Sequence, residues 1–287
     1  VFTVFAALLC LYMAWSIGAN DVANSMGVTV GSRALTFRRA ILVAAVCEFA
    51  GAVLVGSDVS DTVRKGIVNP EVFADAPEQF ALGMLCALAA CAVWLHIATW
   101  LGMPVSTTHS IVGAVAGFGA VAAGVQSVCW PKLGAIVLSW VTSPLAGLVL
   151  GFLAFRLLTR LVLGRSDPVA AAVHATPAIV FIVVALITLA TIYDGLKNIL
   201  PPERLAATGH DACLMAGSVG LAAAVVSRGF VGRFVRTSAW APLPEQLHRV
   251  ERVFIPLAVL SSCSVAFGHG ANDVANAVGP LAAVLDT

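Results

Sequence analysis

The heptad GANDVAN occupies residues 18–24 and recurs without change at residues 270–276. The chain has six asparagines, and four of them lie in these two copies. Chance explains a repeat of Ala, Val and Gly in an apolar chain, but it does not explain Asn and Asp residues in the same register. The flanks also agree, since Ser-Met-Gly at 25–27 parallels Ala-Val-Gly at 277–279. The repeat indicates that two parts of the chain share one structural plan.

The composition is that of a membrane protein. Of 287 residues, 60% are hydrophobic and 11% are charged, whereas soluble domains have about a quarter of their residues charged. A net charge of +1 creates no field for polyanions, which excludes a nucleic-acid binder. The seven cysteines form no CxxC or Cys/His cluster, so the sequence supports neither a disulfide framework nor a zinc site. We expect the sequence to be a fragment of a longer protein.

Apolar stretches long enough to cross a bilayer as helix need about 20 residues. The sequence predicts eight such spans and hence an all-α polytopic membrane fold. They cover residues 1–18, 39–56, 79–101, 106–126, 133–155, 177–193, 211–227 and 254–269.

The basic residues orient these spans, because cytoplasmic loops are enriched in Lys and Arg. The odd-numbered connections hold Arg33, Arg38, Arg39, Arg156, Arg160, Arg165, Arg228, Arg233, Arg236, Arg249 and Arg252, and the even-numbered ones hold Arg64, Lys65, Lys132, Lys197 and Arg204. This asymmetry predicts that the odd connections are cytoplasmic and that the N-terminal end is outside.

One heptad follows the first predicted span and the other follows the eighth. Since alternate spans cross in opposite directions, the two copies are expected at opposite faces in opposite orientation. This arrangement is typical of an inverted-topology repeat, the architecture of many secondary transporters. We expect the first repeat over 1–155, connecting spans with a basic cytoplasmic loop over 156–253, and the truncated start of the second repeat over 254–287.

The heptad carries residues that suit a cation site. An Asp at membrane depth is costly and usually functional. Gly, Asn and Asp are poor formers of helix interior, so the sequence predicts broken or re-entrant helices at both copies, with exposed backbone carbonyls. Asp21 with the amide oxygens of Asn20 and Asn24 makes an oxygen-only ligand set for a hard cation. The alternative is that these polar side chains only hold helices together.

A second polar motif, Gly-Met-Pro-Val-Ser-Thr-Thr-His at 102–109, precedes an apolar run. Pro104 disfavours helix just before itself, which makes Ser106 or Thr107 a natural N-cap for the following helix. Backbone N–H groups at a helix start, joined by three hydroxyls, form an anion site without a fixed charge. The alternative is an ordinary helix cap at a span boundary.

Three further residues near these motifs have side chains that ionise. Glu48 lies in the middle of a predicted span, which makes it a functional candidate; the alternative is a protonated packing residue. His109 and His269 flank the polar motifs and are interpreted as hydrogen-bonding neighbours of the site, because they lack partners at metal-ligand spacing.

These motifs resemble those of the inorganic phosphate transporter (PiT) family. The matching segments are 18–25, 104–113 and 270–280, and residues 48–56 and 62–67 resemble the family's segment after the first motif. The similarity is weak near 160–210 and 230–250. The resemblance implies a phosphate symporter with an inverted repeat. The Ser-Met-Gly continuation and the Arg-Lys-Gly-Ile segment are more similar to the sodium-coupled branch than to the proton-coupled one.

The resemblance also implies roles for individual residues. Phosphate is expected to contact Ser106, Thr107 and Thr108, and sodium to be held by Asp21, Asn24, Asp273 and Asn276, with Asn20, Asn272 and Glu48 adjoining. Family members carry a second Pro-x-Ser-Thr-Thr motif in the second repeat, and this sequence does not contain it.

Charge balance agrees with symport. Every Lys and Arg lies in a connection or at the end of a predicted span, so no basic residue in the middle of a span balances phosphate together with Asp21 and Asp273. Like charges repel strongly in a low-dielectric medium, and cations are therefore expected to enter with the anion. The alternatives are a permease for sulfate or another oxyanion, a membrane-embedded hydrolase using His109, Asp21 and Asp273, and a structural or receptor role.

We therefore expect a secondary active symporter and not an enzyme, with no cofactor besides a coupling ion. The expected partners are inorganic phosphate, sodium or a proton, and the lipid bilayer, without nucleic acid. A homodimer is kept as a candidate assembly. The expected location is a multi-pass position in the plasma membrane.

Overall fold

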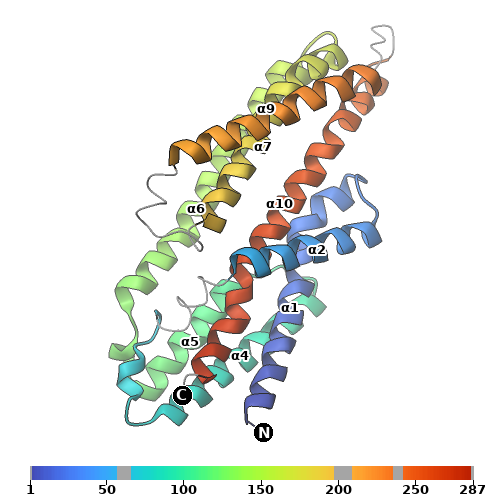
Figure 1. Cartoon of the computed structure of the whole chain (residues 1–287). Helices are drawn as coiled ribbons and strands as arrows, with labels where there is room; N and C mark the ends of the chain where they lie inside the picture. Colours follow the sequence, from blue (N-terminus) through green and yellow to red (C-terminus); the bar gives the residue numbers. More distant parts are fainter. Residues whose placement is uncertain (1, 57–65, 197–208, 235–241, 286–287) are drawn as a thin grey trace. The chain divides into compact units, whose positions relative to one another are not determined.

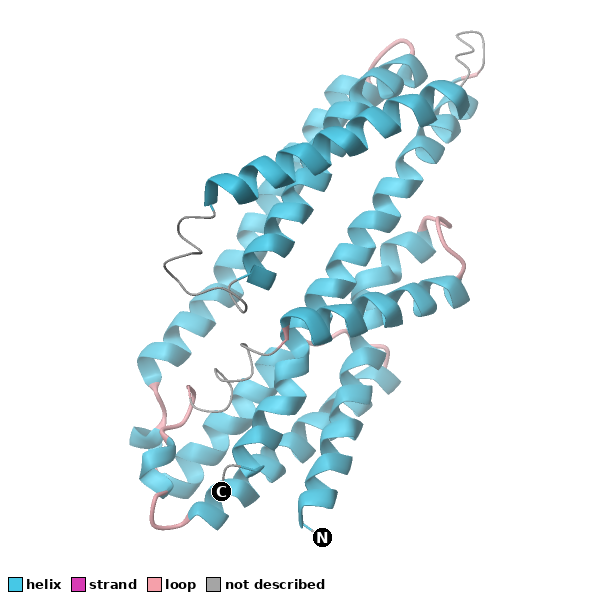
Figure 2. Cartoon of the chain, viewed as in Figure 1, coloured by secondary structure: helices cyan, strands magenta, loops and turns pink. Residues whose placement is uncertain are grey.

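The computed structural model describes residues 2–56, 66–196, 209–234 and 242–285. Within these ranges the chain is helical and has no strand (Figure 2). The long helices are α1 (Phe2–Gly31), α2 (Phe37–Val55), α4 (Pro77–Trp100), α5 (Thr107–Ala123), α6 (Trp130–Leu158), α7 (Pro168–Leu196), α9 (Gly209–Phe234) and α10 (Leu243–Leu285). Short helical turns are η1 (Pro70–Phe73), η2 (Val125–Ser127) and η3 (Thr159–Leu163).

The chain divides into two compact units. Unit 1 comprises Val1–Trp140 and Ser262–Thr287, and unit 2 comprises Val141–Ser261. In unit 2, α7 packs along α9, and Val162, Val169, Ala172 and Val250 form a small buried cluster. The units reflect packing rather than sequence repeats, so the division into 1–155, 156–253 and 254–287 stays a prediction.

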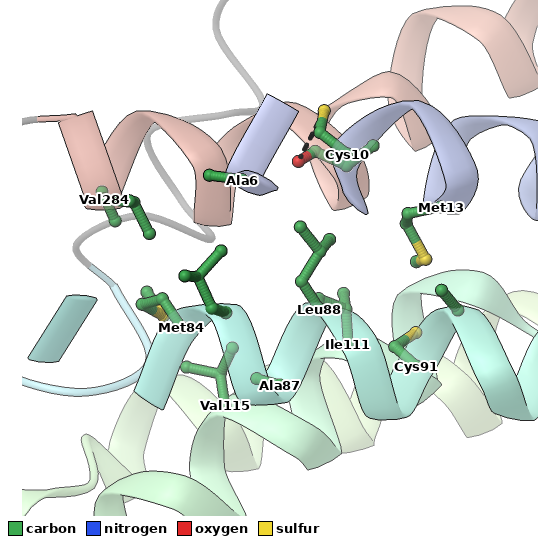
Figure 3. Close-up of a cluster of buried hydrophobic side chains, with 14 of the residues drawn as sticks. Ala6, Cys10, Met13, Met84, Ala87, Leu88, Cys91, Ile111, Val115 and Val284 are labelled. Carbon is green, nitrogen blue, oxygen red and sulfur yellow. Dashed lines mark hydrogen bonds between the residues drawn. The ribbon is translucent and has the colours of Figure 1, made fainter. Parts of the chain in front are cut away.

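The core of unit 1 lies between α1, α4 and α5 (Figure 3). Met13 of α1, Leu88 of α4 and Ile111 of α5 are fully buried in it. Helix α4 buries residues on several faces, as expected of a helix that is apolar all round. Close contact between these side chains stabilises the packing of the three helices by van der Waals attraction.

Six helices in the described part of the chain are long and apolar enough to cross a membrane: α1, α4, α6 with η3, α7, α9 and α10. The predicted spans at 39–56 and 106–126 correspond to the other two long helices. Helix α2 has 19 residues and carries Arg38, Arg39 and Glu48, and α5 has 17 residues. The basic residues Arg64, Lys65, Lys197, Arg204 and Arg236, and most of the matching segment 62–67, lie outside the described residues.

The predicted helix breaks at the two heptads are wrong. Helix α1 continues through residues 18–24 and α10 continues through residues 270–276. Gly, Asn and Asp each cost up to about 1 kcal/mol in a helix interior. Hydrogen bonds from Asn20 and Asn276 to other segments offset that cost. The helix is interrupted instead between α4 and α5, where Gly102 adopts φ +70°.

The two heptads lie on antiparallel helix segments within unit 1. Ala6 near the start of α1 and Val284 near the end of α10 belong to the same buried cluster, and Figure 1 shows the two segments running in opposite directions. This opposite orientation is what an inverted repeat requires, and the repeat itself stays a prediction.

Candidate functional site

A cavity of about 310 Å³ lies between α1, α2 and α10 in unit 1. Its polar lining comes from Asp21, Glu48, His269 and Asp273, and most of the rest is apolar. The cavity therefore joins one heptad to the other and adds the intramembrane glutamate that the sequence singled out.

Two of the acids in this cavity, Asp21 and Glu48, each have a carboxyl oxygen without the partner that buried carboxylates normally require. Asp21 Oδ2 and Glu48 Oε1 are buried without a hydrogen-bond partner, as is His269 Nδ1. Asp21 and Asp273 line the same cavity, and none of the described residues that line it is a Lys or Arg. Because unpaired buried charge is costly, this arrangement favours a cation or a proton between the acids.

The hydroxyl motif meets the second heptad directly. Thr107 Oγ1 donates to Asp273 Oδ1 at 2.9 Å, and Thr108 Oγ1 donates to the same atom at 3.2 Å. Asn276 Nδ2 lies 2.8 Å from Asp273 Oδ1, 3.1 Å from Thr107 Oγ1 and 3.2 Å from Thr108 Oγ1. Thr107 and Thr108, which are expected to bind phosphate, thus form one network with Asp273 and Asn276, which are expected to bind sodium.

The start of α5 supplies the donors of this network. Ser106 is the N-cap, and its hydroxyl accepts from His109 N–H at 3.2 Å. The N–H groups of Thr107 and Thr108 precede the first intrahelical bond, so helix geometry leaves them available as donors. Thr107 is buried, whereas Ser106 is exposed. The predicted N-cap is confirmed at Ser106.

Two glycines allow α2 and α10 to approach closely enough to close the cavity. A Cβ on Gly51 would collide with the carbonyl oxygen of Phe267, and a Cβ on Gly270 would collide with the carbonyl oxygen of Glu48. The first residue of the second heptad is therefore a packing requirement that holds Glu48 beside the acids. The sequence contained this signal only as a glycine in a repeated motif.

Three other predicted residues lie outside the network. Asn20 bonds to the connection between α4 and α5. Asn24 is exposed. Asn272 is exposed and donates to Gly268 O in its own helix.

The two histidines that flank the polar motifs have different surroundings in the structure. His269 lines the cavity with an unpartnered Nδ1, which differs from the hydrogen-bonded neighbour that the sequence predicted. The His109 ring packs on Trp140 with the ring centroids 3.8 Å apart. Thr99 was missed, because a single Thr in an apolar helix carries no sequence signal.

Among the described residues, no group of three or more His, Cys, Asp or Glu side chains is arranged to hold a metal ion. A cation in this cavity would need amide, hydroxyl or backbone oxygens in addition to carboxylates. The amide oxygens of Asn24 on α1 and of Asn276 on α10 are of that kind. Such neutral oxygens are acceptable ligands for a hard cation.

Known proteins similar to this chain are named as phosphate transporters and permeases. The phosphate transporter family matches residues 17–287. The chain is 41% identical over 298 residues to the inorganic phosphate transporter 2-1, chloroplastic, of Arabidopsis thaliana, covering 98% of this chain and 50% of that protein. It is 41% identical over 274 residues to a putative phosphate permease of Thermococcus kodakarensis, covering 95% of this chain and 64% of that protein.

A solved structure described as the sodium-dependent phosphate transporter matches with a TM-score of 0.85 and 40% identity, covering 99% of this chain and 67% of that one. The chain thus spans between half and two thirds of the length of these relatives. It is an integral multi-pass membrane protein, and it belongs to the phosphate transporter family.

Proposed function

We propose that this chain forms the substrate-binding part of a symporter that imports inorganic phosphate with sodium. The observation that carries the proposal is the network in which Thr107 and Thr108 donate to Asp273, an acid of the cavity. Hydroxyl groups suited to an anion therefore bond directly to an acid suited to a cation. Binding of the two ions is then coupled by contact, which is what symport requires.

Phosphate would bind at the start of α5. The available N–H groups of the first turn, the positive end of the helix dipole and the Thr107 and Thr108 hydroxyls are all donors. This site has no Lys or Arg, so it favours the anion only when a cation balances the nearby acids. An anion site of this kind has little affinity for phosphate alone.

The acids favour phosphate over sulfate. At neutral pH phosphate carries at least one O–H, which donates to a carboxylate such as Asp21 or Asp273, whereas sulfate is fully deprotonated. A carboxylate facing sulfate is left without its hydrogen bond and adds repulsion. The oxyanion alternative is therefore weaker, although both anions fit a tetrahedral site.

Sodium is the favoured coupling ion. The acids Asp21 and Asp273 with amide oxygens are hard ligands, and the similar solved structure is described as sodium-dependent. A proton is the second candidate, because Asp21, Glu48 and Asp273 line one cavity and a proton on one carboxylate relieves the repulsion between neighbouring acids. Either ion would give a partner to the buried carboxyl oxygens Asp21 Oδ2 and Glu48 Oε1.

Cation binding would release the phosphate donors. In this structure, Asp273 Oδ1 accepts from Thr107, Thr108 and Asn276. A cation on Asp273 competes with these donors for the same oxygen. The two hydroxyls are then available to phosphate, so the cation binds first and the anion second.

The test is uptake of labelled phosphate into proteoliposomes that contain the full-length protein. A sodium gradient should drive uptake, a proton gradient of equal size should drive much less, and excess sulfate should compete weakly. Uptake driven by the proton gradient and not by the sodium gradient would make the proton the coupling ion, and strong sulfate competition would favour the oxyanion permease. Release of phosphate from an ester would support the hydrolase, and no flux would leave a structural or receptor role.

The location and assembly remain expectations. The Arabidopsis relative is named as chloroplastic, so a plasma-membrane position for this chain is a prediction to be tested by fractionation. The homodimer is likewise a prediction, which mass measurement in detergent or nanodiscs would test.

A further inference from the structure

The connection between α4 and α5 contains backbone groups that neither helix satisfies. Helix α4 ends with Gly102 N–H bonded to Thr99 O at 3.0 Å and Met103 N–H bonded to Ala98 O at 2.8 Å. This Schellman pattern requires the positive φ of Gly102. Pro104 has no N–H. The Met103 carbonyl and the Val105 N–H are left between this cap and the Ser106 cap of α5.

Asn20 of α1 supplies partners for both groups. Its Oδ1 accepts from Val105 N–H at 3.1 Å, and its Nδ2 donates to Met103 O at 3.2 Å. The second proton of Nδ2 goes to Thr99 Oγ1 at 3.0 Å, at the end of α4. Asn20 is 3% exposed. A single buried amide therefore uses its acceptor and both its donors on this connection.

Helix geometry separates Asn20 from the cation cavity, although Asp21 is its neighbour in sequence. Successive residues of an α-helix point about 100° apart, and adjacent side chains do not face each other. Asp21 lines the cavity, whereas Asn20 contacts the connection. The first heptad thus presents Asp21 on one face of α1 and Asn20 on another.

From this geometry, and resting on the proposed function, we propose that Asn20 is a positioning residue for the phosphate donors. Val105 directly precedes Ser106, so the Asn20 amide fixes the backbone on which Thr107 and Thr108 follow. Because Asn20 and Asp21 are consecutive, α1 sets the spacing between the phosphate donors and the acids. This role differs from the position beside sodium that the sequence predicted for Asn20.

The second heptad does not repeat this contact in the described residues. Asn272 holds the position of Asn20 in that copy, yet it is exposed and donates to Gly268 O one turn back in α10. The role of Asn20 therefore follows from its surroundings and not from the motif alone.

The experiment measures phosphate uptake by the full-length protein in proteoliposomes, with phosphate varied at saturating sodium and sodium varied at saturating phosphate. Asn20→Ala removes three hydrogen bonds and should raise the phosphate KM about tenfold or more. The sodium concentration for half-maximal uptake should stay within about twofold, because Asn20 does not line the cavity. Thr99→Val removes one of the three bonds and should raise the phosphate KM less.

Asn69→Ala is the matched control. It removes an Asn whose side chain accepts only a local bond from Glu71 N–H at the start of η1, and it should leave both constants unchanged. If Asn20→Ala fails to insert, Asn20→Gln retains the amide one methylene farther out. Its phosphate KM should then rise, again with an unchanged sodium response.

A rise in the sodium constant with an unmoved phosphate KM would overturn the positioning role and make Asn20 a cation ligand. Unchanged constants in Asn20→Ala would also overturn it. Failure of the unaltered protein to take up phosphate with sodium would instead refute the proposed function, so the two failures are distinguishable.

Discussion

The hydroxyl of Thr107 donates to the carboxylate of Asp273 across 2.9 Å, although the two residues are 166 positions apart in the chain. The bond links the start of α5 to the second heptad. Asp273 accepts hydrogen bonds from the hydroxyl groups that phosphate would use. Its carboxylate therefore competes with phosphate for these donors. Predictions for the two sites therefore cannot be made independently.

Removing the charge of either heptad acid should abolish sodium-driven uptake. Asp21→Asn and Asp273→Asn keep the size of the side chain but remove a negative oxygen from the cavity, and a hard cation loses a charged ligand. The measurement is labelled phosphate uptake in proteoliposomes, with membrane insertion checked separately. Uptake at the parental rate and sodium dependence in either variant would show that the carboxylate concerned does not bind the ion.

Removing both hydroxyls should weaken phosphate binding and strengthen sodium binding. The double variant Thr107→Val and Thr108→Val keeps the shape of the α5 start. Each lost hydrogen bond to a charged group costs about 1.5–3 kcal/mol, so phosphate affinity should fall at least tenfold. Sodium affinity without phosphate should rise, because Asp273 Oδ1 loses two competing donors.

Sodium binding is measured by calorimetry on the purified protein. The sequence alone predicts little change in sodium affinity, since it assigns the hydroxyls to the anion and the heptads to the cation. Ser106→Ala is the comparison variant and should cost about 1 kcal/mol of helix stability as a lost cap. Retained phosphate affinity together with a weakened sodium response in the double variant would reverse the assigned roles.

Much of this site could be predicted from the sequence, and what could not be predicted has a physical reason. Asp21 and Asp273 are identifiable because charge inside apolar helices is costly, and Ser106 because Pro104 precedes it. Glu48 is identifiable for the same reason as the aspartates. The sequence does not reveal that Thr107 bonds to Asp273, since that contact depends on how α5 and α10 pack.

The helix breaks predicted at the heptads illustrate the same limit. Propensity ranks Asn20 and Asn276 as poor helix residues, but tertiary hydrogen bonds to Met103 O and Thr107 Oγ1 offset the local cost. The real interruption, at Gly102, is encoded by a glycine and a proline two residues apart. Propensity locates such a turn well, whereas it misjudges polar residues whose partners are distant in sequence.

The distribution of basic residues makes a prediction about topology that the structure leaves open. Single cysteines placed beside Arg33 and Arg233 should react only with a reagent on the cytoplasmic side, and one beside Asp75 only from outside. The measurement is labelling of intact cells with a membrane-impermeant maleimide. Reaction of positions 33 and 75 from the same side would remove the orientation on which the inverted repeat depends.

Adding a methyl group at Gly270 should open the cavity. A Cβ there would collide with the backbone carbonyl of Glu48, and backbone cannot rotate away as a side chain does. Overpacking of this kind costs about 1–3 kcal/mol. Gly270→Ala should therefore lower the thermal midpoint of the purified protein and raise the sodium concentration needed for half-maximal uptake, because α2 carries Glu48 away from Asp21 and Asp273.

Gly268→Ala is the control on the same helix. A Cβ at Gly268 meets nothing within 4 Å, and Ala is about 1 kcal/mol better than Gly in a helix interior. The control should keep or slightly raise the thermal midpoint and leave sodium dependence unchanged. Gly51→Ala, which would collide with Phe267 O from the other side of the same contact, should behave like Gly270→Ala. If Gly270→Ala and Gly268→Ala gave the same midpoint and sodium constant, close contact between α2 and α10 would not be what holds Glu48 at the site.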